Sequence, residues 1–305
     1  MKYQKTLITG GRGLVGSAIE SNYKPTSEEL NLMYYDEIVD YLTRNEIDSI
    51  IHCAAKVGGI KANWDYAADF FDENILMNTN LLRAAHHCGV EKVVSFMSTC
   101  IFPDLGVQYP LTACQMHEGE PHPSNFAYAY AKRMIEVQTR AYRQQHNRNY
   151  VSVIPCNIYG PNDNFDLNDS HVVPALIRKC HTAMKEGTDF EVWGDGTPLR
   201  EFIYSGDVAK IAKWALESFD SYEPLIVSTD EEISINDVAT AIADEFGFTG
   251  NIVFTGGHGG QHRKPSDNRD LKYLMNGLGG IEFTSFKDGI RKTIEWYNKA
   301  ENIRL

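Results

Sequence analysis

The sequence has no long apolar segment, and its charges form no block of one sign. No stretch approaches the roughly 20 apolar residues that a membrane-spanning helix needs. The apolar run near the N-terminus ends at Gly10, too early for a signal peptide, so we expect a cytoplasmic protein without a membrane partner. The formal net charge of −12 argues against nucleic acid as a partner, because binding a phosphate backbone requires a basic patch.

Closely spaced cysteine pairs are also missing. The six cysteines are scattered along 305 residues, at positions 53, 88, 100, 114, 156 and 180. This pattern is typical of reduced, mostly buried thiols in a cytosolic protein. We expect no metal site.

The first half of the chain alternates short apolar runs with helical patterns. The run at 47–53 precedes a helical pattern at 69–88, and the run at 92–97 precedes another at 128–146. These runs lack apolar–polar alternation, which suits strands covered on both faces. The order predicts an α/β fold, a Rossmann-like doubly wound parallel sheet.

From about Asn157 the pattern becomes rich in glycine, proline, asparagine and aspartate, with helical patterns at 173–185, 235–246 and 286–299. We expect residues 1–156 to form the cofactor-binding domain and residues 157–305 to form mainly a smaller substrate-binding lobe. The chain is expected to return to the first domain around 203–228.

A glycine turn, Gly10-Gly-Arg-Gly-Leu-Val-Gly16, follows the apolar run at 6–9, and a helix is expected at 14–21. Glycines allow a tight turn and bring a pyrophosphate to the helix N-terminus, while Gly16 allows close helix–strand packing. The turn predicts dinucleotide binding; a merely structural turn is the alternative.

NAD sites usually hold the ribose with an acidic residue after the second strand, and residues 21–31 contain no such strand. Arg12 and Lys24, unless they are solvated surface charges, could face a 2′-phosphate, which favours NADP(H).

Tyr128 and Lys132 lie four residues apart, on one face of the helix expected at 128–146. A neighbouring ammonium lowers the pKa of a phenol from about 10, so that it can exchange a proton near neutrality. Ser98 follows the strand at 92–97, at the edge where doubly wound sheets build their sites, and could polarise a carbonyl beside Tyr128. Lys132 could also hold the nicotinamide ribose.

The glycine turn, Ser98 and the Tyr128/Lys132 pair resemble the extended short-chain dehydrogenase/reductase family. Further segments resemble its GDP-L-fucose synthase branch, at 52–60, 98–103, 157–165, 170–175 and 193–202. The resemblance covers the chain from about residue 6 to about residue 270. The segments with Cys100 and His171 are specific to this branch.

This resemblance implies NADPH-dependent conversion of GDP-4-keto-6-deoxy-D-mannose to GDP-L-fucose, by 3,5-epimerisation and then 4-keto reduction. It implies that Cys100 is the base and His171 the acid of the epimerisation. Both groups can exchange protons around neutrality, because a free thiol titrates near 8.5 and an imidazole near 6.5. Ser98 and Tyr128 would stabilise the enolate oxygen and then assist reduction of the same carbonyl.

The resemblance also implies a homodimer, formed through the helices at 69–88 and 128–146. It places the GDP-sugar against Lys179, Trp193, Arg200 and Lys264, although Trp193 could instead be a core aromatic and the two lysines surface charges. It places the cofactor against Gly10, Gly11, Arg12, Gly13, Leu14, Val15, Gly16, Asn31, Leu32, Ala54, Ala55, Met97, Ser98, Lys132, Pro155, Asn157, Ile158 and His171.

Two departures and two alternatives accompany this interpretation. The chain between Gly16 and Asn31 is shorter than in the family, and the second strand with its arginine is largely missing; Thr99 stands where the family often has serine.

A plain 4-reductase or 4-epimerase of another nucleotide sugar would not need Cys100 and His171. A non-catalytic, cofactor-sensing protein of the same fold would commonly lack the Tyr/Lys pair.

Overall fold

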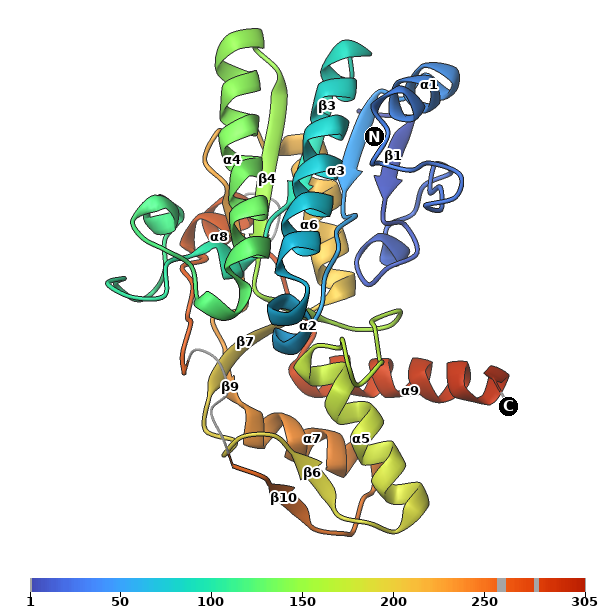
Figure 1. The fold of residues 1–305 in the computed structure, drawn as a ribbon, viewed down its shortest axis with the longest axis vertical. Coiled ribbons are helices and arrows are strands. Elements are labelled where there is room, and N and C mark those ends of the chain that lie inside the picture. The colour runs from blue at the N-terminus through green and yellow to red at the C-terminus, as the bar shows by residue number, and fades with distance from the viewer. Residues whose placement is uncertain (1, 257–261, 277–279, 305) are drawn as a thin grey trace.

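The computed structural model describes residues 2–256, 262–276 and 280–304 (Figure 1). Its larger lobe is built on a five-stranded parallel sheet. In spatial order the strands are β1 (Thr6–Thr9), β2 (Ser49–His52), β3 (Lys92–Phe96), β4 (Asn149–Pro155) and β8 (Leu225–Val227).

The sheet has a hydrophobic core on each face, because successive side chains of a strand point to opposite faces. Leu7, Ile50 and Val93 pack in one core with helices α1 (Tyr35–Asn45) and α3 (Ala67–His87). Their neighbours Ile8, Ile51 and Val94 pack in another core with α6 (Ser205–Ser218). Figure 1 shows α3 and the adjacent α4 (Phe126–His146) on one side of the sheet and α6 on the other. This arrangement confirms the predicted α/β, doubly wound fold.

The smaller lobe lies below the sheet in Figure 1. Its core joins residues of α5 (Val172–Glu186), α7 (Ile235–Phe246) and α9 (Phe286–Arg304). One small sheet has the order β5 (Asn157–Tyr159), β7 (Leu199–Tyr204), β9 (Glu232–Ser234), and another pairs β6 (Phe190–Val192) with β10 (Ile252–Phe254). Between these segments the chain passes back to the large sheet, where β8 pairs with β4 and contacts α8 (Arg269–Asn276).

Short elements border the cleft. They are α2 (Ile60–Asp65) and the 3₁₀ turns at Gly16–Ala18, Thr99–Ile101 and Pro123–Asn125, whereas no residue of a further 3₁₀ turn, Ala113–His117, lines it.

The helix predicted at 14–21 is wrong. Only the 3₁₀ turn Gly16–Ala18 forms there, and in place of the family's second strand the chain makes a single parallel bridge between Leu7 and Tyr23. The amide of Ile8 donates to the Tyr23 carbonyl at 2.9 Å, so the chain must already lie beside β1 at that point. The segment Ser17–Asn22 is too short to form a helix of several turns and also return, since a helix rises only about 1.5 Å per residue.

Candidate active site

One cleft of about 1260 Å³ runs between the two lobes. It exceeds the roughly 300–1,000 Å³ of a site for one small ligand, so it can take a dinucleotide and a second ligand together. Every residue that the resemblance assigns to the site lines it: the seven residues 10–16, then Asn31, Leu32, Ala54, Ala55, Met97, Ser98, Cys100, Tyr128, Lys132, Pro155, Asn157, Ile158, His171, Lys179, Trp193, Arg200 and Lys264.

In the glycine turn, neighbouring backbone segments lie too close to Gly10 and Gly16 to allow side chains there, and no α-helix directly follows the turn. Gly10 has φ +65°, and a Cβ there would lie 2.8 Å from the amide nitrogen of Ala54. A Cβ on Gly16 would lie 2.3 Å from the Gly10 carbonyl oxygen, whereas one on Gly13 would meet nothing closer than 3.5 Å. Gly10 and Gly16 are therefore required by the fold, whereas a Cβ on Gly13, which lines the cleft, would make only an ordinary contact. These residues fit a dinucleotide, but without the helix N-terminus that the sequence analysis expected.

The expectation that Lys24 faces a 2′-phosphate is wrong. Its ammonium donates to the carbonyl oxygens of Ser17 (3.2 Å) and Ile19 (2.7 Å), and Lys24 does not line the cleft. Lys24 therefore stabilises the short segment Ser17–Asn22, in which the chain turns back toward β1 after the glycine turn. Arg12, which is exposed and lines the cleft, supplies a cation at this end.

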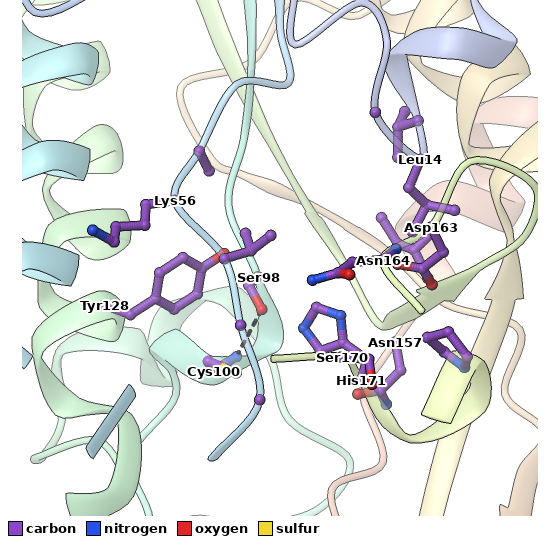
Figure 2. Close-up of a pocket in the computed structure, with 18 of the residues that line it drawn as sticks. Leu14, Lys56, Ser98, Cys100, Tyr128, Asn157, Asp163, Asn164, Ser170 and His171 are labelled. Atoms are coloured by element: carbon purple, nitrogen blue, oxygen red, sulfur yellow. Dashed lines mark hydrogen bonds between the residues drawn. The ribbon is translucent and has the colours of Figure 1, made fainter. Parts of the chain in front are cut away.

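The reacting groups of the larger lobe meet at the end of β3. Ser98 hydrogen-bonds the Tyr128 phenol, and its Oγ accepts from the Cys100 amide at 3.3 Å. The Phe70 ring of α3 packs edge-on against Tyr128, with ring centres 6.4 Å apart. Figure 2 shows the Tyr128 hydroxyl and Ser98 side by side above Cys100. A carbonyl oxygen placed here could meet two hydroxyl groups.

Lys132 lies over the Tyr128 ring, but its ammonium is hydrogen-bonded elsewhere. Its ammonium donates to the Phe96 carbonyl at 3.0 Å and lies 6.0 Å from the centre of the Tyr128 ring. Burial lowers the pKa of Lys132 to about 8, since a buried cation loses its hydration. Burial likewise raises the pKa of Tyr128, and the Ser98 hydrogen bond opposes that rise only in part. In the free protein the phenol therefore keeps its proton and can act as an acid.

Cys100 and His171 come from different lobes. Cys100 lies in the turn after β3, and His171 immediately precedes α5. In Figure 2 the imidazole lies across the cleft from Tyr128, with Ser98 between them. The surrounding protein lowers the pKa of His171 by desolvation.

Two cations lie within electrostatic reach of Cys100. Burial lowers the pKa of both Arg200 and Lys264, and a negative charge on Cys100 counteracts that effect at each. The thiol thus lies beside basic groups, the environment in which reactive cysteines are found.

The far end of the cleft is more open. Trp193 is 68% exposed, so it is not a core aromatic. The Lys179 ammonium lies 4.2 Å from the centre of its ring, a cation–π contact. A planar ligand could stack on this indole.

The sequence analysis missed four polar residues of the cleft. Each has a buried oxygen without a hydrogen-bond partner among the described residues: Asn63, Asn125, Asp163 and Ser170. Asp163 and Ser170 lie inside segments used for the resemblance, but nothing in their spacing indicated burial. Native proteins rarely leave such groups unsatisfied, so these oxygens are candidates for ligand contacts.

The described residues contain neither a membrane-spanning helix nor a metal-binding cluster. No helix there has the length and apolar character to cross a membrane. No group of three or more His, Cys, Asp or Glu side chains in the same ranges could hold a metal ion.

Comparisons with known proteins agree with this geometry. Residues 6–227 match the NAD dependent epimerase/dehydratase family. The chain is 43% identical over 305 residues to the GDP-L-fucose synthase of Dictyostelium discoideum, covering 95% of this chain and 94% of the relative. It is 35% identical over 320 residues to that of Escherichia coli (strain K12), covering 97% of each. A crystal structure of a GDP-L-fucose synthetase from Naegleria fowleri bound to NADP superimposes with a TM-score of 0.90 and 37% identity, covering 98% of this chain and 94% of the other. This chain therefore belongs to the NAD dependent epimerase/dehydratase family, in the branch that contains the GDP-L-fucose synthases.

Proposed function

We propose that this protein converts GDP-4-keto-6-deoxy-D-mannose to GDP-L-fucose, by 3,5-epimerisation followed by NADPH-dependent reduction of the 4-ketone. The observation that carries this proposal is the placement of Cys100 and His171, which reach one cleft from opposite lobes around the Ser98–Tyr128 pair. A plain 4-reductase would need only that pair and Lys132. The names of the relatives support the same activity.

The cofactor would lie along the glycine turn and the ends of β2 to β4. When bound it supplies hydride to the substrate carbonyl. Arg12 would contact the 2′-phosphate, and Lys132 would hold the nicotinamide ribose while it donates to Phe96. Asn157 and Ile158, which line the cleft just after β4, would lie beside the nicotinamide.

Epimerisation requires proton removal and return on opposite faces of the sugar. The C4 ketone acidifies the protons on C3 and C5; the Cys100 thiolate would remove each proton, and the electron pair would move onto the C4 oxygen. Ser98 and Tyr128 would donate hydrogen bonds to that enolate oxygen. His171 would return a proton to carbon from the other lobe, as a general acid.

Reduction would use the same oxygen site. As hydride reaches C4, the carbonyl oxygen gains negative charge, and Tyr128 would protonate it. The raised pKa of Tyr128 suits this role, because the phenol holds its proton until an alkoxide forms. Lys132, four residues away on α4, would stabilise the resulting phenolate through its charge.

The GDP part would occupy the smaller lobe. Arg200 and Lys264 would bind the diphosphate, for which a guanidinium offers a planar pair of donors. Lys179 and Trp193 would contact the nucleoside. In this division residues 1–156, with a return around 203–228, bind the cofactor, and residues 157–305 bind mainly the substrate.

The protein would act in the cytoplasm as a homodimer. Helices α3 and α4 contact one another and expose large apolar side chains, Phe71 and Leu76 on α3 and Phe126 and Val137 on α4. Exposed apolar side chains on adjacent helices mark an interaction surface. Light scattering should report twice the mass of one chain.

The decisive experiment incubates the protein with NADPH and GDP-4-keto-6-deoxy-D-mannose in deuterated water. We expect NADPH consumption, GDP-L-fucose as product and deuterium at C3 and C5. Cys100→Ser should suppress the exchange while leaving NADPH affinity within about twofold, and Cys114→Ser, which alters an exposed thiol, should leave both unchanged.

Reduction without deuterium at C3 and C5 would identify a plain 4-reductase. Cofactor binding without turnover of the sugar would identify the non-catalytic alternative. Replacing NADPH with NADH at low concentration tests the cofactor, and a clear preference for NADH would contradict the choice of NADPH.

A further inference from the structure

Asp163 is a carboxyl group in the cleft that the proposed mechanism does not use. It lies in the loop between β5 and α5. Its Oδ1 accepts from the Asn164 amide at 2.8 Å, whereas Oδ2 has no exposed surface and no hydrogen-bond partner among the described residues. Burying such an oxygen without a partner is costly, so the atom is expected to gain one when the cleft is filled.

The neighbours of Asp163 show which ligand could supply that partner. Asp163 and Leu14 of the glycine turn both line the cleft, and Figure 2 shows them on the same side of the view, opposite Tyr128. In dinucleotide-binding folds the backbone of this turn receives the diphosphate and its flanking riboses. Asp163 therefore faces the cofactor part of the cleft.

No positive charge on the described residues compensates the carboxyl. Its pKa is raised to about 7 by burial, opposed only by the Asn164 amide, and no charged side chain alters it. Leu14, Asn157 and Asn164, labelled on its side of Figure 2, are uncharged, and the titratable His171 lies between it and Tyr128 in that view. A diphosphate placed nearby would favour the protonated carboxyl further, because like charges repel.

We propose that Asp163 binds the nicotinamide dinucleotide as a neutral carboxylic acid, donating a hydrogen bond from Oδ2 to an oxygen of the cofactor's diphosphate–ribose part beside Leu14. The oxygens of a diphosphate only accept hydrogen bonds, so a protonated carboxyl satisfies both partners and an ionised one satisfies neither. Asp163 is thus a positioning residue for the cofactor. The proposal depends on cofactor binding alone and not on the sugar substrate.

Cofactor binding should then be linked to uptake of a proton. Below pH 7 the free carboxyl is already protonated, and binding changes nothing. Above pH 7 the free protein must take up a proton to bind, so the Kd should rise with pH, by up to about tenfold per unit. A carboxylate that instead accepted from a ribose hydroxyl would produce the opposite trend, with the Kd rising as the pH falls.

The test is calorimetric titration of the whole protein with NADH and with NADPH between pH 6 and 9, in two buffers that differ in ionisation enthalpy. NADH is included because it lacks the 2′-phosphate of NADPH. That phosphate has its own pKa and would otherwise contribute to the measured proton uptake. In wild type we expect uptake of up to about one proton per NADH at pH 8. Asp163→Asn keeps a hydrogen-bond donor but cannot titrate. The Kd of this variant for NADH should therefore no longer rise between pH 7 and 8, and its binding should take up less than half as many protons as that of wild type.

Asp166→Asn is the matched control, because Asp166 is an exposed acid of the same loop, and it should behave as wild type. The difference between wild type and Asp163→Asn also removes any contribution of His171 and Lys132. Equal proton uptake in the two proteins, or a wild-type Kd that falls with rising pH, would overturn the proposal. If Asp163→Asn does not fold, difference infrared spectroscopy of wild type at pH 8 decides: NADH binding must produce a protonated-carboxyl band, and its absence would equally overturn the proposal.

Discussion

The two ends of the cleft differ in how far their side chains are held in place before any ligand binds. At the reacting end, Lys132 is 1% exposed and bonded to Phe96, and Tyr128 is fixed by Ser98 and Phe70. At the open end, Trp193 is 68% exposed, and the face of its ring contacts Lys179. Catalytic groups must keep their geometry through the reaction, whereas binding groups can be ordered by the ligand itself. Changes at the reacting end should therefore affect the rate, and changes at the open end should affect affinity.

The largest effect is expected from Tyr128→Phe. Losing the phenolic proton should lower kcat for reduction by about 10²–10⁴-fold, with the Kd for NADPH changed by less than about threefold. Stopped-flow and steady-state measurement of NADPH oxidation would check this. Tyr130→Phe, two residues along the same helix, is the control and should retain kcat. A drop in NADPH affinity as large as the drop in kcat would show that Tyr128 positions the cofactor rather than transferring a proton.

A smaller effect is expected from raising the pH at saturating NADPH. The pKa of Lys132 is lowered to about 8 by burial, so the side chain is charged below that pH and neutral above it. Loss of the charge removes stabilisation of the Tyr128 phenolate, and kcat for reduction should fall above pH 8 by up to about tenfold per unit. Lys132→Arg, whose charge persists, should be slower but should lack this alkaline fall. The same fall in both proteins would assign it to another group.

The smallest effect is expected from Trp193→Ala. Removing one exposed stacking surface should raise KM for the nucleotide sugar by about tenfold, corresponding to roughly 1.4 kcal/mol, and should leave kcat within about twofold. Trp64→Ala is a close control, because Trp64 is 66% exposed but does not line the cleft. A fall in kcat comparable to that of Tyr128→Phe would contradict this expectation. It would mean that Trp193 also determines the geometry of the reacting groups.

Much of the fold followed from local patterns. The helix expected at 235–246 matches α7, and those at 69–88 and 128–146 match α3 and α4 to within about two residues. These segments are long and strongly patterned, and their apolar faces are covered by the sheet. The helix α1 was not anticipated, because its few buried residues, such as Ile38 and Leu42, lie among many polar ones.

The first βαβ unit was predicted less well, since a motif does not specify the length of chain available to build it. The spacing of the glycines suggested a helix, but the bridge between Leu7 and Tyr23 requires the chain to turn back at once. The same short return engages Lys24 through backbone carbonyls. Lys24, which was expected to contact a ligand, therefore stabilises the fold instead.

The sequence by itself determined the parallel sheet, because strands and helix faces follow from periodicity, and the family resemblance of its motifs implied many of the residues that line the cleft. The tertiary structure alone decided the electrostatic state of those residues. Burial lowers the pKa of Lys132 and raises that of Tyr128, and Asp163 has a buried oxygen without a hydrogen-bond partner among the described residues. Desolvation depends on every chain segment packed around a group, and that packing has no counterpart in the spacing of residues along the chain.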